Sequence, residues 1–167
     1  LQSKVPFFDT DKKYNIRATF KTGSFGLANP SILWEQKLNK NISSSFSAEY
    51  MYTTGRYKFR YKKIDGYDTT AIRHNGDVKA LRAEIGLFGL IPDGNWRTRI
   101  YAYNSERGYP GAVVKNRFSN EDRQWDTNFF LQSSFRKKFN TFYSLLLNGK
   151  FAYDYLHYLS DQREAES

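Results

Sequence analysis

The chain contains no cysteine, which excludes a disulfide framework and a thiolate metal site. Its two histidines, His74 and His157, lie far apart, and no thiol is present to complete a transition-metal site. The segment "DGYD" (residues 65–68) lacks the remaining acidic positions of an EF-hand calcium loop. We therefore expect neither a metal ion nor a cofactor.

Long apolar runs are also missing. No stretch reaches the roughly 18 consecutive apolar residues that a membrane-spanning helix needs. The first 15 residues contain no apolar core flanked by basic residues, so we expect no signal peptide in them.

The sequence has no legible arrangement of a nucleophile and a base, and no nucleophile-elbow motif. Glu84 shares a polar strand face with Arg82, and Glu35 shares one with Lys37, but a ladder of charges explains both pairs more simply than acid–base chemistry. We expect that the chain is not an enzyme.

Aromatic residues, in contrast, are abundant at 18%, and together with only four prolines they favour β structure. Seven segments alternate apolar and polar residues with a period of two, the pattern of strands with two chemically distinct faces. We predict an all-β fold, an antiparallel up-and-down meander in a single segment. Its strands are expected near residues 14–22, 31–38, 43–54, 77–90, 95–104, 124–136 and 141–156.

The connections between these segments alternate in length. The long ones are predicted at residues 23–30, 54–76 and 105–123. The short ones are predicted at residues 39–41, 92–95 and 137–140. Alternate connections of a meander lie at the same end, so long loops gather at one end and tight turns at the other, as in outer-membrane barrels. The sequence therefore predicts part of a transmembrane β-barrel in the outer membrane of a Gram-negative bacterium.

The last apolar stripe has the height of a membrane band. Tyr143 and Tyr153 bracket it ten residues apart. At about 3.3 Å per residue and a tilt of about 40 to 45°, this spacing spans about 23 to 25 Å, against an apolar band about 25 Å tall. We expect Tyr143 at the periplasmic interface, and Tyr153 with Tyr155 at the outer interface.

In a barrel of this kind the polar side chains line a wet interior. The residues predicted to face this lumen are Arg17, Glu35, Glu49, Arg82, Glu84, Arg97, Arg99, Tyr101, Asp126 and Asn128.

Two other folds fit the same alternation. A soluble β-sandwich or lipocalin-like binding module would turn the apolar face inward and preserve the pattern. A small eight-stranded outer-membrane adhesin or pore would need one more strand, for which "SKVPFFDT" (residues 3–10) is a candidate. The alternating loop lengths and the tyrosine-bounded stripe favour the membrane interpretation.

The net charge of +9 indicates a phosphate-bearing partner, which is found in nucleic acids and in membrane lipids. The segment "GRYKFRYKK" (residues 55–63) interleaves aromatic and basic residues. This pattern fits a surface for single strands, a contact with lipopolysaccharide phosphates, or a solvated strand. We expect membrane lipid and lipopolysaccharide as partners rather than nucleic acid.

The segments "GSFGLANPSILWEQKLNKNISSSFSAEYMYTTGRY", "LFGLIPDGNWRTRIYAYNS", "ERGYPGAVV" and "RQWDTNFFLQSSFRKKF" resemble the early barrel strands of TonB-dependent outer-membrane receptors of Bacteroidetes. The resemblance implies active uptake of a scarce nutrient such as cobalamin or a metal chelate (siderophore), driven by TonB through a plug domain. The sequence contains no plug domain and no TonB box, and seven strands fall short of the roughly 22 of a plugged barrel. We therefore expect a fragment of the barrel.

The resemblance also implies that extracellular loops capture a small-molecule ligand. Two of the long connections supply polar and aromatic candidates for this contact. The predicted ligand-binding residues are Tyr67, Arg73, His74, Glu106, Arg107 and Tyr109.

Overall fold

The computed structural model describes residues 13–62, 66, 68–111 and 120–160, and β-strands make up most of this part of the chain. The predicted all-β class is confirmed. The elements are β1 (Tyr14–Gly23), η1 (Ser24–Gly26, a 3-10 turn), β2 (Leu27–Lys37), β3 (Ile42–Thr53), β4 (Tyr57–Lys62), β5 (Asp68–Arg73), β6 (Val78–Ile91), β7 (Gly94–Tyr109), β8 (Asp122–Lys138) and β9 (Ser144–Leu159).

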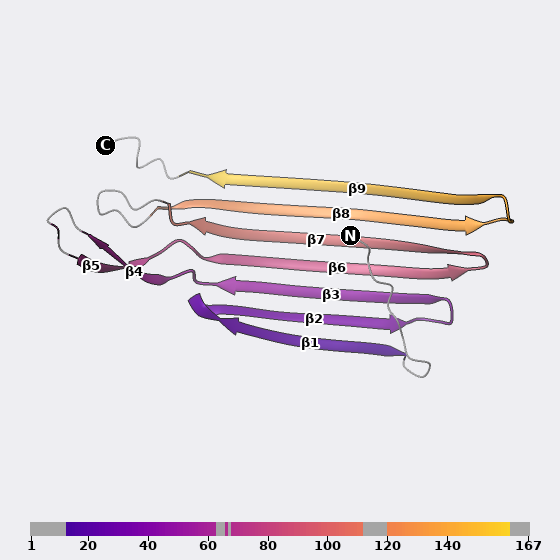
Figure 1. Cartoon of the computed structure of the whole chain (residues 1–167), viewed down its shortest axis with the longest axis horizontal. Helices are drawn as coiled ribbons and strands as arrows, with labels where there is room; N and C mark the ends of the chain where they lie inside the picture. Colours follow the sequence, from indigo (N-terminus) through magenta and orange to yellow (C-terminus); the bar gives the residue numbers. More distant parts are fainter. Residues whose placement is uncertain (1–12, 63–65, 67, 112–119, 161–167) are drawn as a thin grey trace.

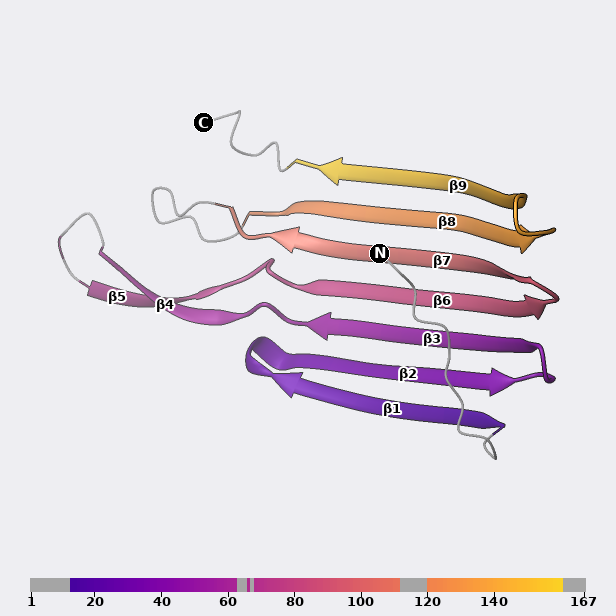
Figure 2. The same cartoon turned by 45° about the vertical axis from the view of Figure 1, so that its right-hand side comes forward.

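Seven strands form one antiparallel sheet in the order β1-β2-β3-β6-β7-β8-β9 (Figure 1). β4 and β5 pair only with each other and form a hairpin between β3 and β6. Figures 1 and 2 both show this hairpin extending beyond one end of the sheet. The predicted up-and-down meander is therefore confirmed, with a hairpin added to one of its connections.

The connections alternate between the two ends of the sheet, as predicted. We call the end with the β1–β2, β3–β6 and β7–β8 connections the loop end, and the opposite end the turn end; they lie left and right in Figure 1. The prediction of a long connection over residues 23–30 is wrong. There Phe25 and Gly26, with φ of 62° and 67°, reverse the chain within η1 and lead directly into β2.

The β7–β8 hairpin is longer than predicted. β7 ends at Tyr109 instead of residue 104, and β8 begins at Asp122 instead of residue 124, so residues 105–109 and 122–123 of the predicted loop are strand. Pairing continues from Ser105 opposite Asp126 to Tyr109 opposite Asp122. Opposite charges across this pairing stabilise the extension, although its polar composition is typical of a loop.

Two connections at the turn end are closed by the same kind of hydrogen bonding to an asparagine side chain. The Asn39 side-chain oxygen accepts hydrogen bonds of 2.8 Å from the backbone N–H groups of Asn41 and Ile42. The Asn140 oxygen accepts equivalent bonds of 2.8 Å from Phe142 and Tyr143. Each asparagine thus completes its turn locally. Tyr143, predicted within a strand, lies one residue before β9.

The register places apolar residues of all seven strands in one row, because each member pairs with the next across the sheet. The face that carries this row is called the apolar face, and the opposite one the polar face. The members of the row are Ile16, Trp34, Phe46, Ile85, Ile100, Leu131 and Phe151. The predicted alternation therefore holds in register from one edge of the sheet to the other.

The described strands form a single layer without a core. Ala80 is the only buried hydrophobic residue in the part of the chain that the structure describes. The accessible surface is 12718 Å², whereas a folded monomer of 19.6 kDa exposes about 8,600 Å² by surface scaling. Leu131, Leu145 and Leu147 remain 39%, 37% and 56% exposed. The apolar face is therefore not covered by a second layer of described residues.

The sheet is open. Among the described residues β1 pairs only with β2, and β9 pairs only with β8. No described segment forms a helix long and apolar enough to cross a membrane.

Candidate functional site at the loop end of the sheet

Ion pairs and hydrogen bonds link neighbouring strands across the polar face. Arg82 pairs with Glu49, and the Arg99 guanidinium lies 2.5 Å from the Glu84 carboxylate. The register places all the residues predicted to face a lumen on this polar face. They are Arg17, Glu35, Glu49, Arg82, Glu84, Arg97, Arg99, Tyr101, Asp126 and Asn128.

Aromatic side chains also lie on the polar face. The rings of Tyr101 and Phe130 stack with their centroids 4.8 Å apart, and the Lys150 ammonium lies 5.3 Å from the Phe130 centroid. The polar face thus combines charge with stacked rings.

The loop end carries the densest set of polar contacts. Its centre is Arg123, whose guanidinium lies 2.9 Å from the Asp77 carboxylate and 2.6 Å from that of Glu106. It also donates a hydrogen bond of 3.1 Å to the Asn75 side-chain oxygen. We call Asn75, Asp77, Glu106 and Arg123 the loop-end cluster. It joins the β5–β6 connection to β7 and β8.

Asn75 connects three backbone segments. Its side-chain nitrogen donates to the carbonyls of Tyr109, Asn120 and Asp122 at 3.0, 2.6 and 2.9 Å. Its φ of 58° lies in the left-handed region, which asparagine tolerates better than most residues. Gly108 leaves the space that Asn75 fills: a Cβ there would lie 2.2 Å from the Asn75 side-chain oxygen.

Arg73, a predicted ligand-binding residue, is only 4% exposed. Its guanidinium donates to the Gly111 carbonyl and, at 2.7 Å, to the Pro110 carbonyl, and it lies 5.8 Å from the centroid of the Phe59 ring. These contacts tie the β4–β5 hairpin to the end of β7. Arg73 therefore supports the geometry of the loop end from a buried position.

On the polar-face side of the loop end, Arg107 pairs with Asp126, which also accepts a hydrogen bond of 3.2 Å from Ser105. The Tyr109 hydroxyl donates to the Gln124 side chain at 2.7 Å. These interactions extend the β7–β8 pairing with specific side-chain contacts.

The structure thus brings five of the six predicted ligand-binding residues to one end of the sheet. Arg73 is buried there, and Glu106, Arg107 and Tyr109 lie on strand β7 instead of in the predicted loop. His74 is exposed beside them. Tyr67 lies outside the described residues.

Three members of the loop-end cluster, Asn75, Asp77 and Arg123, were missed by the sequence reasoning. The dipeptide Asn75–Gly76 was available as a turn signal. The partners of Asn75 lie at least 34 positions further along the chain, and period-two alternation does not encode such contacts.

The charges of the loop-end cluster are mutually compensated. Hydrogen bonding from the Arg123 guanidinium is the main cause that lowers the pKa of the Asp77 carboxyl below its ordinary value of 3.8, against the opposing effect of partial burial. Asp77 is thus held as a carboxylate bound to a guanidinium. Such an arrangement is suited to fixing loop geometry rather than to proton transfer.

Strand β4 separates its aromatic and basic residues onto two faces. Tyr57, Phe59 and Tyr61 follow one another along one face, with centroids 6.4 and 5.8 Å apart. The alternate residues Lys58 and Arg60 are exposed on the other face. The hairpin thus presents a basic surface beyond the loop end.

No group of three or more metal-ligating side chains occurs among the residues that the structure describes. No protein-family model matches the chain, and a search of curated proteins finds no match.

Proposed function

We propose that this chain is part of a transmembrane β-barrel in the bacterial outer membrane, and that the barrel belongs to a TonB-dependent receptor. The receptor would import a scarce nutrient such as cobalamin or a metal chelate. The barrel is supported by the chemistry of the two faces of the sheet. The receptor class is supported by the resemblance of residues 23–57, 87–114 and 123–139 to receptor barrel strands.

The apolar face carries the membrane proposal. Its central row crosses all seven strands, and its members range from 36% exposed at Ile100 to 61% exposed at Phe151. Seven strands at about 4.8 Å spacing and a band about 25 Å tall give an area of about 700 Å². The largest apolar patch of a typical soluble monomer is about 300 to 600 Å². Lipid would cover this whole face without a second protein layer.

The polar face supports the same proposal. Its cross-strand ion pairs, such as Arg99 with Glu84, are favourable in contact with water, whereas placing these charges against hydrocarbon would cost free energy. In a barrel this face would line the interior. A soluble sandwich would also leave it in water, so the two folds differ only in what covers the apolar face.

The two ends of the sheet fit the two sides of an outer membrane. The turn end has short connections, as periplasmic ends do. The loop end carries the β4–β5 hairpin and the β7–β8 connection and would face outward. Its exposed His74 and Tyr109 are the candidates for direct contact with a small-molecule ligand, while the loop-end cluster and Arg73 would hold the ligand-binding loops in place.

The absence of native cysteine makes a direct test of the barrel proposal possible. Single cysteines placed at Leu131 and, as a matched control, at its neighbour Gln132 would be spin-labelled in the chain reconstituted in lipid vesicles. The label at position 131 should be accessible to oxygen dissolved in lipid and protected from a water-soluble nickel relaxant. The label at position 132 should show the opposite preference. Equal exposure of both labels to the nickel reagent would refute lipid contact.

The receptor proposal needs a separate test. The gene that encodes the chain would be deleted in its host, and uptake of labelled cobalamin and of iron siderophores would be measured under starvation for each nutrient. Loss of uptake of one of them supports the proposal and identifies the cargo. Unchanged uptake of every candidate would contradict the receptor role while leaving the barrel intact.

A further inference from the structure

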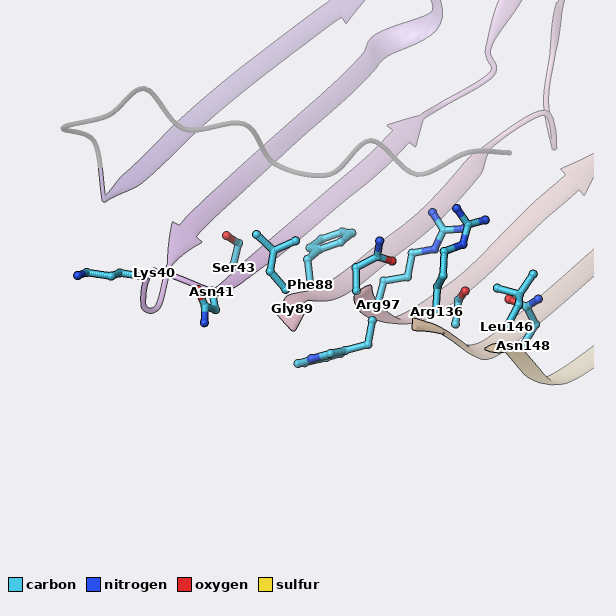
Figure 3. A pocket seen from close by; sticks show the side chains of 13 residues that line it. Lys40, Asn41, Ser43, Phe88, Gly89, Arg97, Arg136, Leu146 and Asn148 are labelled. Atoms are coloured by element: carbon cyan, nitrogen blue, oxygen red, sulfur yellow. The ribbon is translucent and has the colours of Figure 1, made fainter. Parts of the chain in front are cut away.

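A hollow of about 570 Å³ lies on the sheet at the turn end, away from the loop-end cluster. It is lined by residues of β3, β6, β7, β8 and β9 and by the β2–β3 turn (Figure 3). Its volume falls within the range of small-molecule sites, about 300 to 1,000 Å³. The residues that matter for its chemistry are Lys40, Phe88, Arg97, Arg136, Leu146 and Asn148.

Two arginines dominate the hollow. Arg97 pairs with Ser134, and Arg136 pairs with Asn95, so the two arginines are diagonal neighbours on the same face of β7 and β8. Figure 3 shows their guanidinium groups next to one another. Lys40 lies at the opposite edge of the hollow and points away from the two arginines (Figure 3), and none of the lining residues is acidic. The hollow therefore concentrates positive charge.

This arrangement differs from the rest of the polar face. Arg82, Arg99 and Arg107 each pair with a carboxylate on a neighbouring strand. In the part of the chain that the structure describes, neither Arg97 nor Arg136 has an ion-pair partner. Two adjacent guanidinium groups repel each other, and an anion bound between them would remove that cost.

We propose that this turn-end hollow binds a small organic dianion through a phosphate or carboxylate group held by Arg97 and Arg136. Guanidinium groups present paired N–H donors that match the oxygens of both anions. The Asn148 side chain supplies a further polar group, and Phe88 and Leu146 supply apolar walls for the organic part. The volume exceeds what a bare inorganic ion would fill, so an organic body is expected.

The proposal does not depend on what covers the apolar face. The hollow is built mainly on the polar side of the strands, and it would be accessible from water in a barrel interior and in a soluble fold alike. Failure of the lipid-contact test would not count against this anion site. Failure of the anion-binding test would likewise not count against lipid contact.

Two matched probes distinguish the anion. Phenyl phosphate and phthalate both carry two negative charges on one aromatic ring, the first as phosphate and the second as carboxylates. Each would be titrated into the full chain in zwitterionic micelles at low ionic strength, with calorimetry to report affinity. Benzyl alcohol is the neutral control. Saturable binding of at least one dianion with no binding of benzyl alcohol supports the site, and the tighter probe identifies the anion class. No binding of either dianion would overturn the proposal.

The arginines are tested with Arg97→Gln and Arg136→Gln, both at exposed positions where the change should leave the circular dichroism spectrum unaltered. Each should weaken binding about tenfold or more, as expected for loss of a charge-assisted hydrogen bond. The control is Lys137→Gln, which removes one positive charge beside Arg136 but from the opposite face. Equal weakening in all three variants would show nonspecific attraction and overturn the site.

Arg97→Lys provides a second measurement that does not depend on charge removal. It keeps the positive charge but loses the planar guanidinium with its paired N–H donors. The affinity for the dianion should therefore fall severalfold, to a value between those of the wild type and Arg97→Gln. Wild-type affinity in Arg97→Lys would overturn the proposed guanidinium geometry.

Discussion

The two ends of the sheet are held together in different ways. At the turn end, Asn39 and Asn140 each close a turn with backbone groups two and three residues away. At the loop end, the hydrogen bonds of the Asn75 side chain reach across 34 to 48 positions of sequence. The same residue type, asparagine, therefore acts locally at one end and over long range at the other. The turn end depends on local sequence, whereas the loop end depends on the assembled sheet.

The largest effect that separates the two ends is expected from Gly108→Ala. The added Cβ would lie 2.2 Å from the Asn75 side-chain oxygen and 2.6 Å from its backbone oxygen. The backbone must shift to relieve this overlap, so we expect a loss of about 2 to 3 kcal/mol of unfolding free energy. Urea unfolding in micelles, followed by tryptophan fluorescence, measures the loss. Gly149→Ala on β9 is the control, because a Cβ there has no neighbour within 4 Å. Similar losses in both variants would contradict the role of Gly108.

A smaller loss is expected from Asn75→Ala. The change removes three bonds to backbone carbonyls and the acceptor for Arg123. Partly buried carbonyls without partners should cost about 2 kcal/mol. Hydrogen exchange should locate the change: amides at the loop-end halves of β7 and β8 should exchange faster, while those near the turn end keep their protection. Uniform loss of protection along both strands would contradict a local stabilising role of Asn75.

The turn-end asparagines should contribute less. Asn39→Ala and Asn140→Ala each remove two local hydrogen bonds, and we expect about 1 kcal/mol for each. The two turns share no side-chain contacts with each other among the described residues, so their effects should add in the double variant. Unfolding free energies of the two single variants and the double variant check this. Strong non-additivity would show that the turn end is not made of independent local units.

The smallest effect concerns pH. Because the folded-state pKa of Asp77 lies below its ordinary value of 3.8, its pairing with Arg123 stabilises the loop end fully above that value. The contribution is lost as pH falls from about 3.8 through the lower folded-state pKa. The protection factors of amides near Gly108, which compare observed exchange with the intrinsic rate at the same pH, should therefore fall in this acidic range. In Asp77→Asn this part of the pH dependence should disappear, and its persistence would assign the effect to another carboxyl.

Period-two alternation was sufficient to predict the seven strands of the main sheet, because each of them has one apolar and one polar face, but it did not predict the β4–β5 hairpin within residues 54–76. It failed where polar residues continue a strand, as at Glu106 and Arg107, since cross-strand ion pairs hold that extension. It also failed at residues 23–30, where Gly23, Gly26 and Pro30 are typical of a loop but lie at the end of β1, in the tight turn and within β2. The loop-end cluster could not be predicted from the sequence, because its members come into contact only after the strands pair in register.

A sheet of one layer has no inside, and this changes what decides whether a substitution is tolerated. In a globular protein, depth below the surface is the usual guide. In the middle of the sheet the parity of the residue number within its strand takes that place: on β8 the odd positions Phe129 and Leu131 lie on the apolar face, and the even positions Asn128 and Gln132 lie on the polar face. A complete mutational scan should therefore show charge tolerated at every second residue in the middle of each strand, whereas at the loop end the charged pair Glu106 and Arg123 already occupies positions of the apolar face.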